Sequence, residues 1–190
     1  SKNVKKVFHS CREDMDAIFS WTKKLPFNYF DTQLANAFLG GEYSVSYQGL
    51  VKKITGVDID KKETRTNWLR RPLSDSQLDY AASDVQFLLD LYEDQKKKLH
   101  DQRKMSWFKE ELINRYKLPE CNLNKGSEKN LPFTISKNEE KALLKKLNQA
   151  ILSISEKEKI NSTLLCSKKE QRYLIKKIQY VGVEESLKDF

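Results

Sequence analysis

The 190-residue sequence has no apolar run long enough to cross a membrane, and no apolar signal segment opens it. Cysteine is scarce, with Cys11, Cys121 and Cys166 only. Their odd number and their spacing exclude a disulfide framework and a zinc site. We therefore expect free thiols in a reducing compartment such as the cytoplasm. The chain begins with Ser rather than Met, so we also expect the natural start to lie upstream.

The composition is that of a folded, polar-surfaced protein, with 38% hydrophobic, 33% charged and 11% aromatic residues. The net charge is +8, from 35 Lys and Arg against 27 Asp and Glu. Residues 1–100 hold 16 basic and 14 acidic residues, whereas residues 101–190 hold 19 and 13. The basic surplus therefore lies in the second half, which favours a polyanionic partner such as a nucleic acid, although Lys-rich helices are often simply solvated.

The order of elements indicates an α/β domain followed by helices. Residues 3–10 resemble a short strand, and a helix follows with Ser10 and Glu13 at capping-box spacing. Asp31 is placed to cap a short helix that ends at Gly40 and Gly41. Further helices are predicted over residues 43–56, 74–99 and 137–182, and residues 118–136 form a linker rich in Pro and Asn.

Two acidic residues stand out on the predicted helices. At about 100° per residue, Asp84 lies with Phe87, Leu88 and Leu91, away from the polar stripe of its helix, and Tyr80 lies one turn earlier on the same side. An unpaired buried carboxylate is unfavourable, so Asp84 needs a cation, several donors or a metal.

Asp14 occupies a similar position on the first helix, within about 40° of Ile18, Trp21 and Leu25. Two inward acids and a tyrosine are compatible with a metal site. They are also compatible with carboxylates that internal hydrogen bonds or arginines satisfy, and the geometry alone does not prove a metal site.

Three stretches resemble the ribonuclease D family of 3′–5′ exonucleases. They are FHSCREDMDAI (8–18), FDTQLANAFLG (30–40) and TGVDIDKKETRTNWLRRPLSDSQLDYAASDV (55–85). The third is the most specific, with its Asp-Lys pair, Trp, Arg-Pro-Leu and Tyr-x-x-x-Asp. The resemblance implies an α/β fold of the ribonuclease-H-like exonuclease type over residues 1–117.

The resemblance also implies roles for individual residues. Asp14 and Asp84 match metal-ligating aspartates of the family, and Tyr80 matches the tyrosine that orients the attacking water. The implied cofactor is a pair of divalent ions, Mg²⁺ or Mn²⁺, which prefer oxygen ligands. The family's Asp-x-Glu, which supplies two further acids, occurs nowhere in this sequence. We therefore expect the chain to lack the first strands of the domain and to bind metal poorly alone.

The tail SEKEKINSTLLCSKKEQRYLIKKI (155–178) resembles part of a helical RNase-and-helicase C-terminal module, over residues 137–190. Such a module implies contacts with RNA phosphates. Candidates for nucleic-acid binding are Lys168 and Lys169 here, and Lys61 and Arg65 in the first domain; the alternative for each is a solvated surface charge.

The function implied is a 3′–5′ exoribonuclease that trims RNA with a free 3′ end, such as transfer RNA precursors. A degenerate relative that binds RNA without cleaving it is the alternative, and a DNA-directed exonuclease is a third possibility. We expect a monomer with no small-molecule cofactor and no membrane attachment. His9 and Trp68 are expected to pack in the core. The alternative for His9 is contact with the site, and the alternative for Trp68 is stacking on a base.

Overall fold

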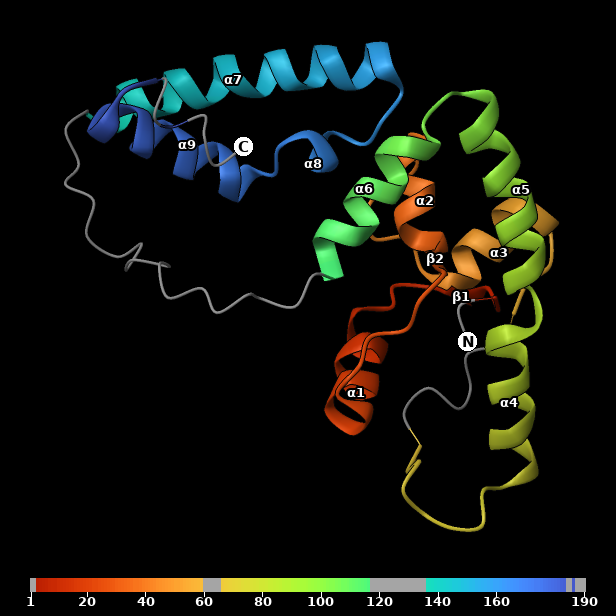
Figure 1. Ribbon diagram of the computed structural model, residues 1–190. Coiled ribbons are helices and arrows are strands. Elements are labelled where there is room, and N and C mark those ends of the chain that lie inside the picture. The colour runs from red at the N-terminus through yellow and green to blue at the C-terminus, as the bar shows by residue number, and fades with distance from the viewer. Residues whose placement is uncertain (1–2, 60–65, 117–135, 184–185, 187–190) are drawn as a thin grey trace. The chain divides into compact units, whose positions relative to one another are not determined.

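The computed structural model describes residues 3–59, 66–116, 136–183 and 186, and the chain divides into two compact units, Ser1–Tyr116 and Lys117–Phe190. The first unit is mixed α/β and the second is helical (Figure 1). None of the helices in these described ranges is long and apolar enough to span a membrane.

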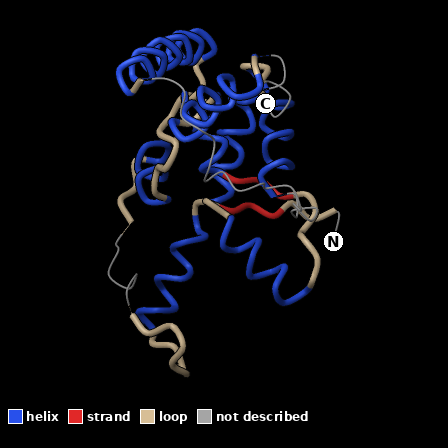
Figure 2. The backbone as a smooth tube through the Cα atoms, turned by 90° about the vertical axis from the view of Figure 1, so that its left-hand side faces the viewer, coloured by secondary structure: helices blue, strands red, loops and turns tan. Residues whose placement is uncertain are grey.

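Two short parallel strands form the sheet of the first unit, β1 (Lys6–Phe8) and β2 (Tyr29–Asp31). Their register pairs Lys6 with Tyr29 and Phe8 with Asp31. In Figure 2 the two strands run side by side among the helices of this unit. The strand predicted over residues 3–10 is confirmed, whereas β2 was not anticipated.

The described residues of the first unit also form six helices: α1 (Arg12–Thr22), α2 (Thr32–Phe38), α3 (Tyr47–Thr55), α4 (Asp75–Gln86), α5 (Leu88–Asp101) and α6 (Met105–Tyr116). Helix α5 packs against α2, α3, α6 and β1, so it is the central helix of the core. One core cluster gathers around Leu50, Val51 and Leu91. In another region Phe108 packs on Phe30, with ring centroids 4.7 Å apart.

The predicted helix ends are largely confirmed. Asp31 accepts hydrogen bonds from the backbone N–H groups of Gln33 and Leu34 as the N-cap of α2. Ser74 and Gln77 form the expected capping box of α4, and Gly56 ends α3 with φ 78°. A left-handed φ of that kind suits glycine, which has no Cβ to clash with the backbone.

Two predictions about helix limits are wrong. Ser10 is not the N-cap of α1, because its φ is 59° and Cys11 takes the cap position without a side-chain hydrogen bond. The helix predicted over residues 74–99 is two helices, since it breaks at Phe87.

The second unit consists of α7 (Lys137–Glu158), α8 (Ser162–Leu165) and α9 (Lys168–Val181). Helix α7 packs on both α8 and α9. The buried apolar side chains in the described part of this unit are Ile151 on α7, Ile160 after it and Ile175 on α9. Capping boxes begin α7 at Ser136 and α9 at Ser167. The predicted helical content of residues 137–182 is confirmed, while the predicted linker, apart from Ser136, lies outside the described residues.

Candidate functional site

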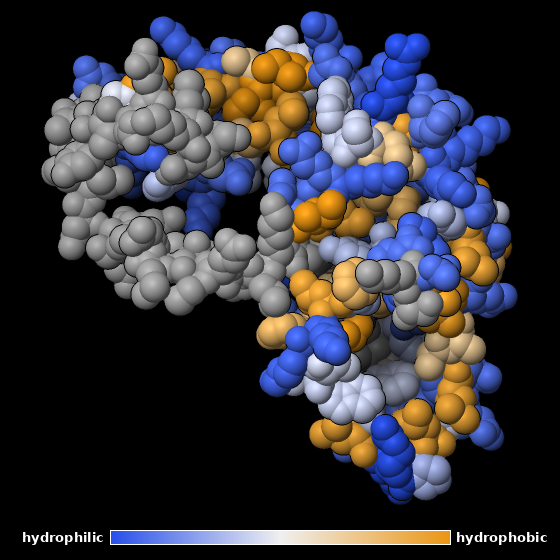
Figure 3. Space-filling model, in the orientation of Figure 1, coloured by the Kyte–Doolittle hydropathy of each residue, from blue (hydrophilic) through white to orange (hydrophobic). Residues whose placement is uncertain are grey.

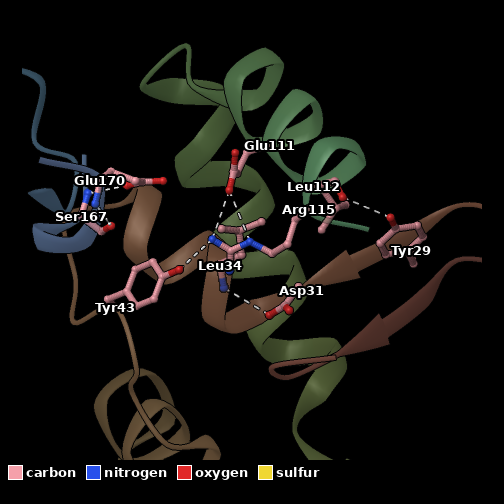
Figure 4. Close-up of polar contacts among 9 residues, drawn as sticks. All are labelled: Tyr29, Asp31, Leu34, Tyr43, Glu111, Leu112, Arg115, Ser167 and Glu170. Atoms are coloured by element: carbon pink, nitrogen blue, oxygen red, sulfur yellow. Dashed lines mark hydrogen bonds and ion pairs between the residues drawn. The ribbon is translucent and has the colours of Figure 1, made fainter. Parts of the chain in front are cut away.

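The carboxylate of Asp31 joins the ends of β1 and β2. Besides capping α2, it accepts hydrogen bonds from the backbone N–H of Ser10 and of Cys11, each at 3.1 Å. Asp31 is 2% exposed, so one buried side chain satisfies all of these donors. Figure 4 shows its bond from the Leu34 N–H. The bonds hold Ser10 in its left-handed turn, which is why Ser10 does not cap α1.

His9 follows β1 and is fixed by two polar contacts. Its Nε2 lies 3.0 Å from the Val45 carbonyl and its Nδ1 lies 2.9 Å from the Thr32 hydroxyl. The carbonyl can only accept, so Nε2 carries a proton. Burial lowers the pKa of His9, against the raising effects of the Val45 carbonyl and of Asp31. His9 is therefore packed as expected, and its burial disfavours the charged form of the ring.

The break between α4 and α5 has a visible cause in the hydroxyl of Tyr47. This hydroxyl donates to the Ser83 carbonyl at 3.2 Å and accepts from the Phe87 N–H at 3.1 Å. In an uninterrupted helix those two backbone groups bond to each other. A side chain that inserts into the ladder in this way kinks or ends the helix. Tyr47 also packs its ring against His9, at 5.8 Å between centroids.

Asp84 lies on the last turn of α4, directly after Ser83, and is half-buried. Burial raises the pKa of the Asp84 carboxyl, while a hydrogen bond from the Tyr80 hydroxyl lowers it. The Tyr80 ring in turn lies 5.9 Å from the Trp68 ring. Sequence and structure therefore agree that Tyr80 and Asp84 form a pair away from the fully solvated face of α4.

The prediction for Asp14 is wrong in its burial. Asp14 is exposed, and Trp21 on the same face of α1 is 89% exposed. Helix α1 instead buries Met15, one residue further along, which is 2% exposed. The buried face of α1 is therefore the one that carries Met15, about 100° around the helix axis from the expected face of Asp14. Apolar residues at the surface of the first unit appear in orange in Figure 3.

The described residues do not assemble a metal centre. No group of at least three His, Cys, Asp or Glu side chains with metal-ligand geometry occurs in them. Asp84 has the expected oxygen chemistry, but Asp14 is not gathered with it into such a group. The side chains of the described residues therefore do not fit a complete divalent-metal site.

The four candidate nucleic-acid contacts fall in different places. Lys61 and Arg65 lie outside the described residues. Lys168 and Lys169 are exposed in the first turn of α9. Lys169 borders a shallow basic hollow with Arg172 and Lys176.

Comparison with known proteins places residues 1–100 in a family described as 3′–5′ exonuclease. The chain is similar to ribonuclease D of Pseudomonas paraeruginosa, 48% identical over 89 residues that make up 47% of this chain and 24% of that protein. Ribonuclease D of a Shewanella species is 40% identical over 109 residues, 57% of this chain and 28% of the relative. The chain therefore spans about a quarter of the length of these curated relatives.

Two solved structures share the fold. Escherichia coli RNase D, described as an exoribonuclease involved in structured RNA processing, superposes with a TM-score of 0.61 and 22% identity, over 99% of this chain and 50% of that one. The catalytic core of RRP6 from Trypanosoma brucei gives a TM-score of 0.54 and 19% identity, over 98% and 57% of the two chains. The predicted ribonuclease-H-like exonuclease fold is confirmed, with a small sheet and a high helix content.

Proposed function

Because this chain belongs to the 3′–5′ exonuclease family, we propose that its protein is an exoribonuclease of the ribonuclease D type. It would hydrolyse phosphodiester bonds at the free 3′ end of RNA, with transfer RNA precursors as the substrate class. The observation that carries the proposal is the family match over residues 1–100, which includes the hydrogen-bonded pair of Tyr80 and Asp84.

The proposed roles follow the chemistry of this pair. Asp84 is a half-buried carboxylate that burial makes harder to ionise, so a nearby cation stabilises its charged form. Tyr80 is a phenol that already donates to Asp84 and can orient a water beside it. Asp14 is proposed as a second acid of the site. Mg²⁺ or Mn²⁺ is the proposed cofactor, and its site requires more oxygen ligands than the described residues bring together.

The second candidate function is RNA binding without cleavage. Two observations favour it: the sequence contains no Asp-x-Glu, and the described residues form no metal-binding group. The exposed Lys168 and Lys169 of the helical unit, with Lys61 and Arg65, would then contact RNA phosphates. We propose that this unit is a partial helical RNase-and-helicase C-terminal module, and that the protein is a cytoplasmic monomer.

A cleavage assay separates the two functions. The full chain is incubated with 5′-labelled single-stranded RNA and Mn²⁺, and products are resolved on a denaturing gel. A ladder of shortened products supports the exonuclease, and it should disappear in Asp84→Asn. Asp79→Asn is the matched control, because Asp79 is an exposed acid on the same helix.

The outcomes are distinct. Retarded migration of RNA in a native gel without any ladder supports the binding function and rejects cleavage by this chain. A ladder that is equally strong in Asp84→Asn rejects the role of Asp84. A single-stranded DNA of the same base sequence, run in parallel, tests the preference for RNA.

A further inference from the structure

A hollow in the first unit lies between β2, α5 and α6. Its volume is about 470 Å³, within the range of roughly 300–1,000 Å³ that holds small-molecule ligands. Aromatic rings form much of its wall, from Tyr29, Phe30, Tyr92 and Phe108. The Tyr29 hydroxyl bonds to the Leu112 carbonyl at 3.2 Å, which ties β2 to α6 beside the hollow (Figure 4).

The rim of this hollow is basic. It includes four lysines, Lys5, Lys96, Lys97 and Lys109, against the acids Glu93 and Asp101. Among the described ion pairs, only Lys96 has a partner in the hollow, Glu93, and at 3.9 Å that contact is loose. The four lysines exceed the two acids, so the rim carries a surplus of two positive charges.

The lysines also repel one another. The pKa of Lys5 is lowered by burial and then by the charges of Lys109, Lys96 and Lys6. An anion among these ammonium groups would relieve the repulsion. The Lys96 ammonium lies 5.2 Å from the centre of the Tyr92 ring, so a positive charge lies directly over an aromatic face of the hollow.

This hollow is at the opposite end of the strands from Asp84. Lys5 precedes β1 and Tyr29 begins β2, so the hollow borders the amino ends of both strands. Asp84 is connected through Ser83 and Tyr47 to His9, which follows the carboxyl end of β1. A ligand in the hollow is therefore distinct from the RNA 3′ end that is proposed to meet Tyr80 and Asp84.

We propose that the hollow walled by Tyr29 and Tyr92 and rimmed by Lys5, Lys96 and Lys109 binds a nucleoside monophosphate. The phosphate meets the lysines and the base lies on the aromatic wall. Stacking of a base on an aromatic side chain is worth about 1–3 kcal/mol, and every base offers a face for it. The ligand is either a free mononucleotide or the 5′-phosphorylated terminal nucleotide of an RNA.

The test is isothermal titration calorimetry of the full chain at low salt, with adenosine 5′-monophosphate, adenosine and inorganic phosphate as separate probes. We expect the monophosphate to bind at least about tenfold more tightly than either part alone, and to weaken as salt is raised. A short RNA with a 5′-phosphate, compared with the same RNA without it, distinguishes a terminal nucleotide from a free one.

The variant pair removes charge without opening the core. Lys96→Gln combined with Lys109→Gln should weaken monophosphate binding by about tenfold or more. Lys98→Gln is the matched control, because Lys98 neighbours the rim on α5 but pairs with Asp94 at 2.8 Å. Its affinity should stay within about twofold of the parent chain. Circular dichroism confirms that each variant is folded.

Four results would overturn the proposal. Adenosine could bind as tightly as its monophosphate, or inorganic phosphate could do so. The affinity could be unchanged in the double variant, or no heat of binding could be measured at millimolar ligand. The experiment involves no cleavage, so its outcome is independent of the proposed exonuclease function.

Discussion

Removal of one hydroxyl group, in Tyr47→Phe, tests the cause of the break between α4 and α5. The ring stays in its core cluster, while the hydrogen bonds to the Ser83 carbonyl and from the Phe87 N–H are lost. Each such bond contributes about 0.5–1.5 kcal/mol net. If the two backbone groups then bond to each other, part of the loss is recovered. We expect a decrease of about 1–2 kcal/mol in the free energy of unfolding.

The assay is urea unfolding followed by tryptophan fluorescence. All three tryptophans, Trp21, Trp68 and Trp107, lie in the first unit, so the signal reports that unit alone. With a urea dependence of about 1–3 kcal/mol per molar, the midpoint should fall by roughly 0.5–1 M.

The control for this variant is Tyr92→Phe. Tyr92 is half-buried, and no hydrogen bond of its hydroxyl occurs in the part of the chain that the structure describes. Removal of that hydroxyl should change the midpoint little. Amide exchange at Phe87 should also differ from the parent only in Tyr47→Phe. Equal midpoints for the two variants would refute the view that the Tyr47 hydroxyl holds the break.

Three further perturbations follow from the same contacts. Asp31→Ala leaves two buried N–H groups without an acceptor and should lower the free energy of unfolding by about 3 kcal/mol. Its control is Asp58→Ala, which breaks only an exposed ion pair and should lower that free energy by less than about 1 kcal/mol. Urea unfolding measures both. The pKa of His9 is lowered in the folded state, so the free energy of unfolding should be highest above pH 6.5 and decline as the pH falls below that value. In a pH series of melting temperatures, His9→Gln should show a smaller decline than the parent. The pKa of Asp84 is raised in the folded state, so its ionised form opposes folding at neutral pH. Asp84→Asn should therefore have a higher melting temperature than the parent at pH 7 and the same melting temperature in acid. A lower melting temperature of the variant at pH 7 would contradict this.

Local sequence rules predicted those features that depend on residues a few positions apart. The capping box of Ser74 and Gln77, the N-cap at Asp31 and the stop at Gly56 all form as expected. In each case the side chain or the φ preference acts on a backbone group within three residues. Such interactions need no partner from elsewhere in the chain, so the local pattern alone is informative.

Features set by distant residues were not predictable in the same way. Ser10 has the spacing of an N-cap, yet Asp31, 21 residues later, fixes its backbone in a left-handed turn. Likewise, a helical wheel drawn at constant pitch runs through Phe87, where the hydroxyl of Tyr47, 40 residues earlier, interrupts the ladder. Nothing in the sequence around Ser10 or Phe87 indicates that Asp31 or Tyr47 will contact them.

The two candidate acids differ in what holds them. Asp84 is positioned by the turn that Tyr47 terminates and by the hydroxyl of Tyr80, so its half-buried state is built into the packed part of the first unit. Asp14 is on α1, whose packing depends on Met15, and the face that carries Asp14 is open to solvent. An exposed carboxylate gains little from a cation because water already stabilises its charge. For Asp14 to act as the proposed second acid, a surface would have to cover its face of α1, and burial of Trp21 would be the spectroscopic sign of that surface.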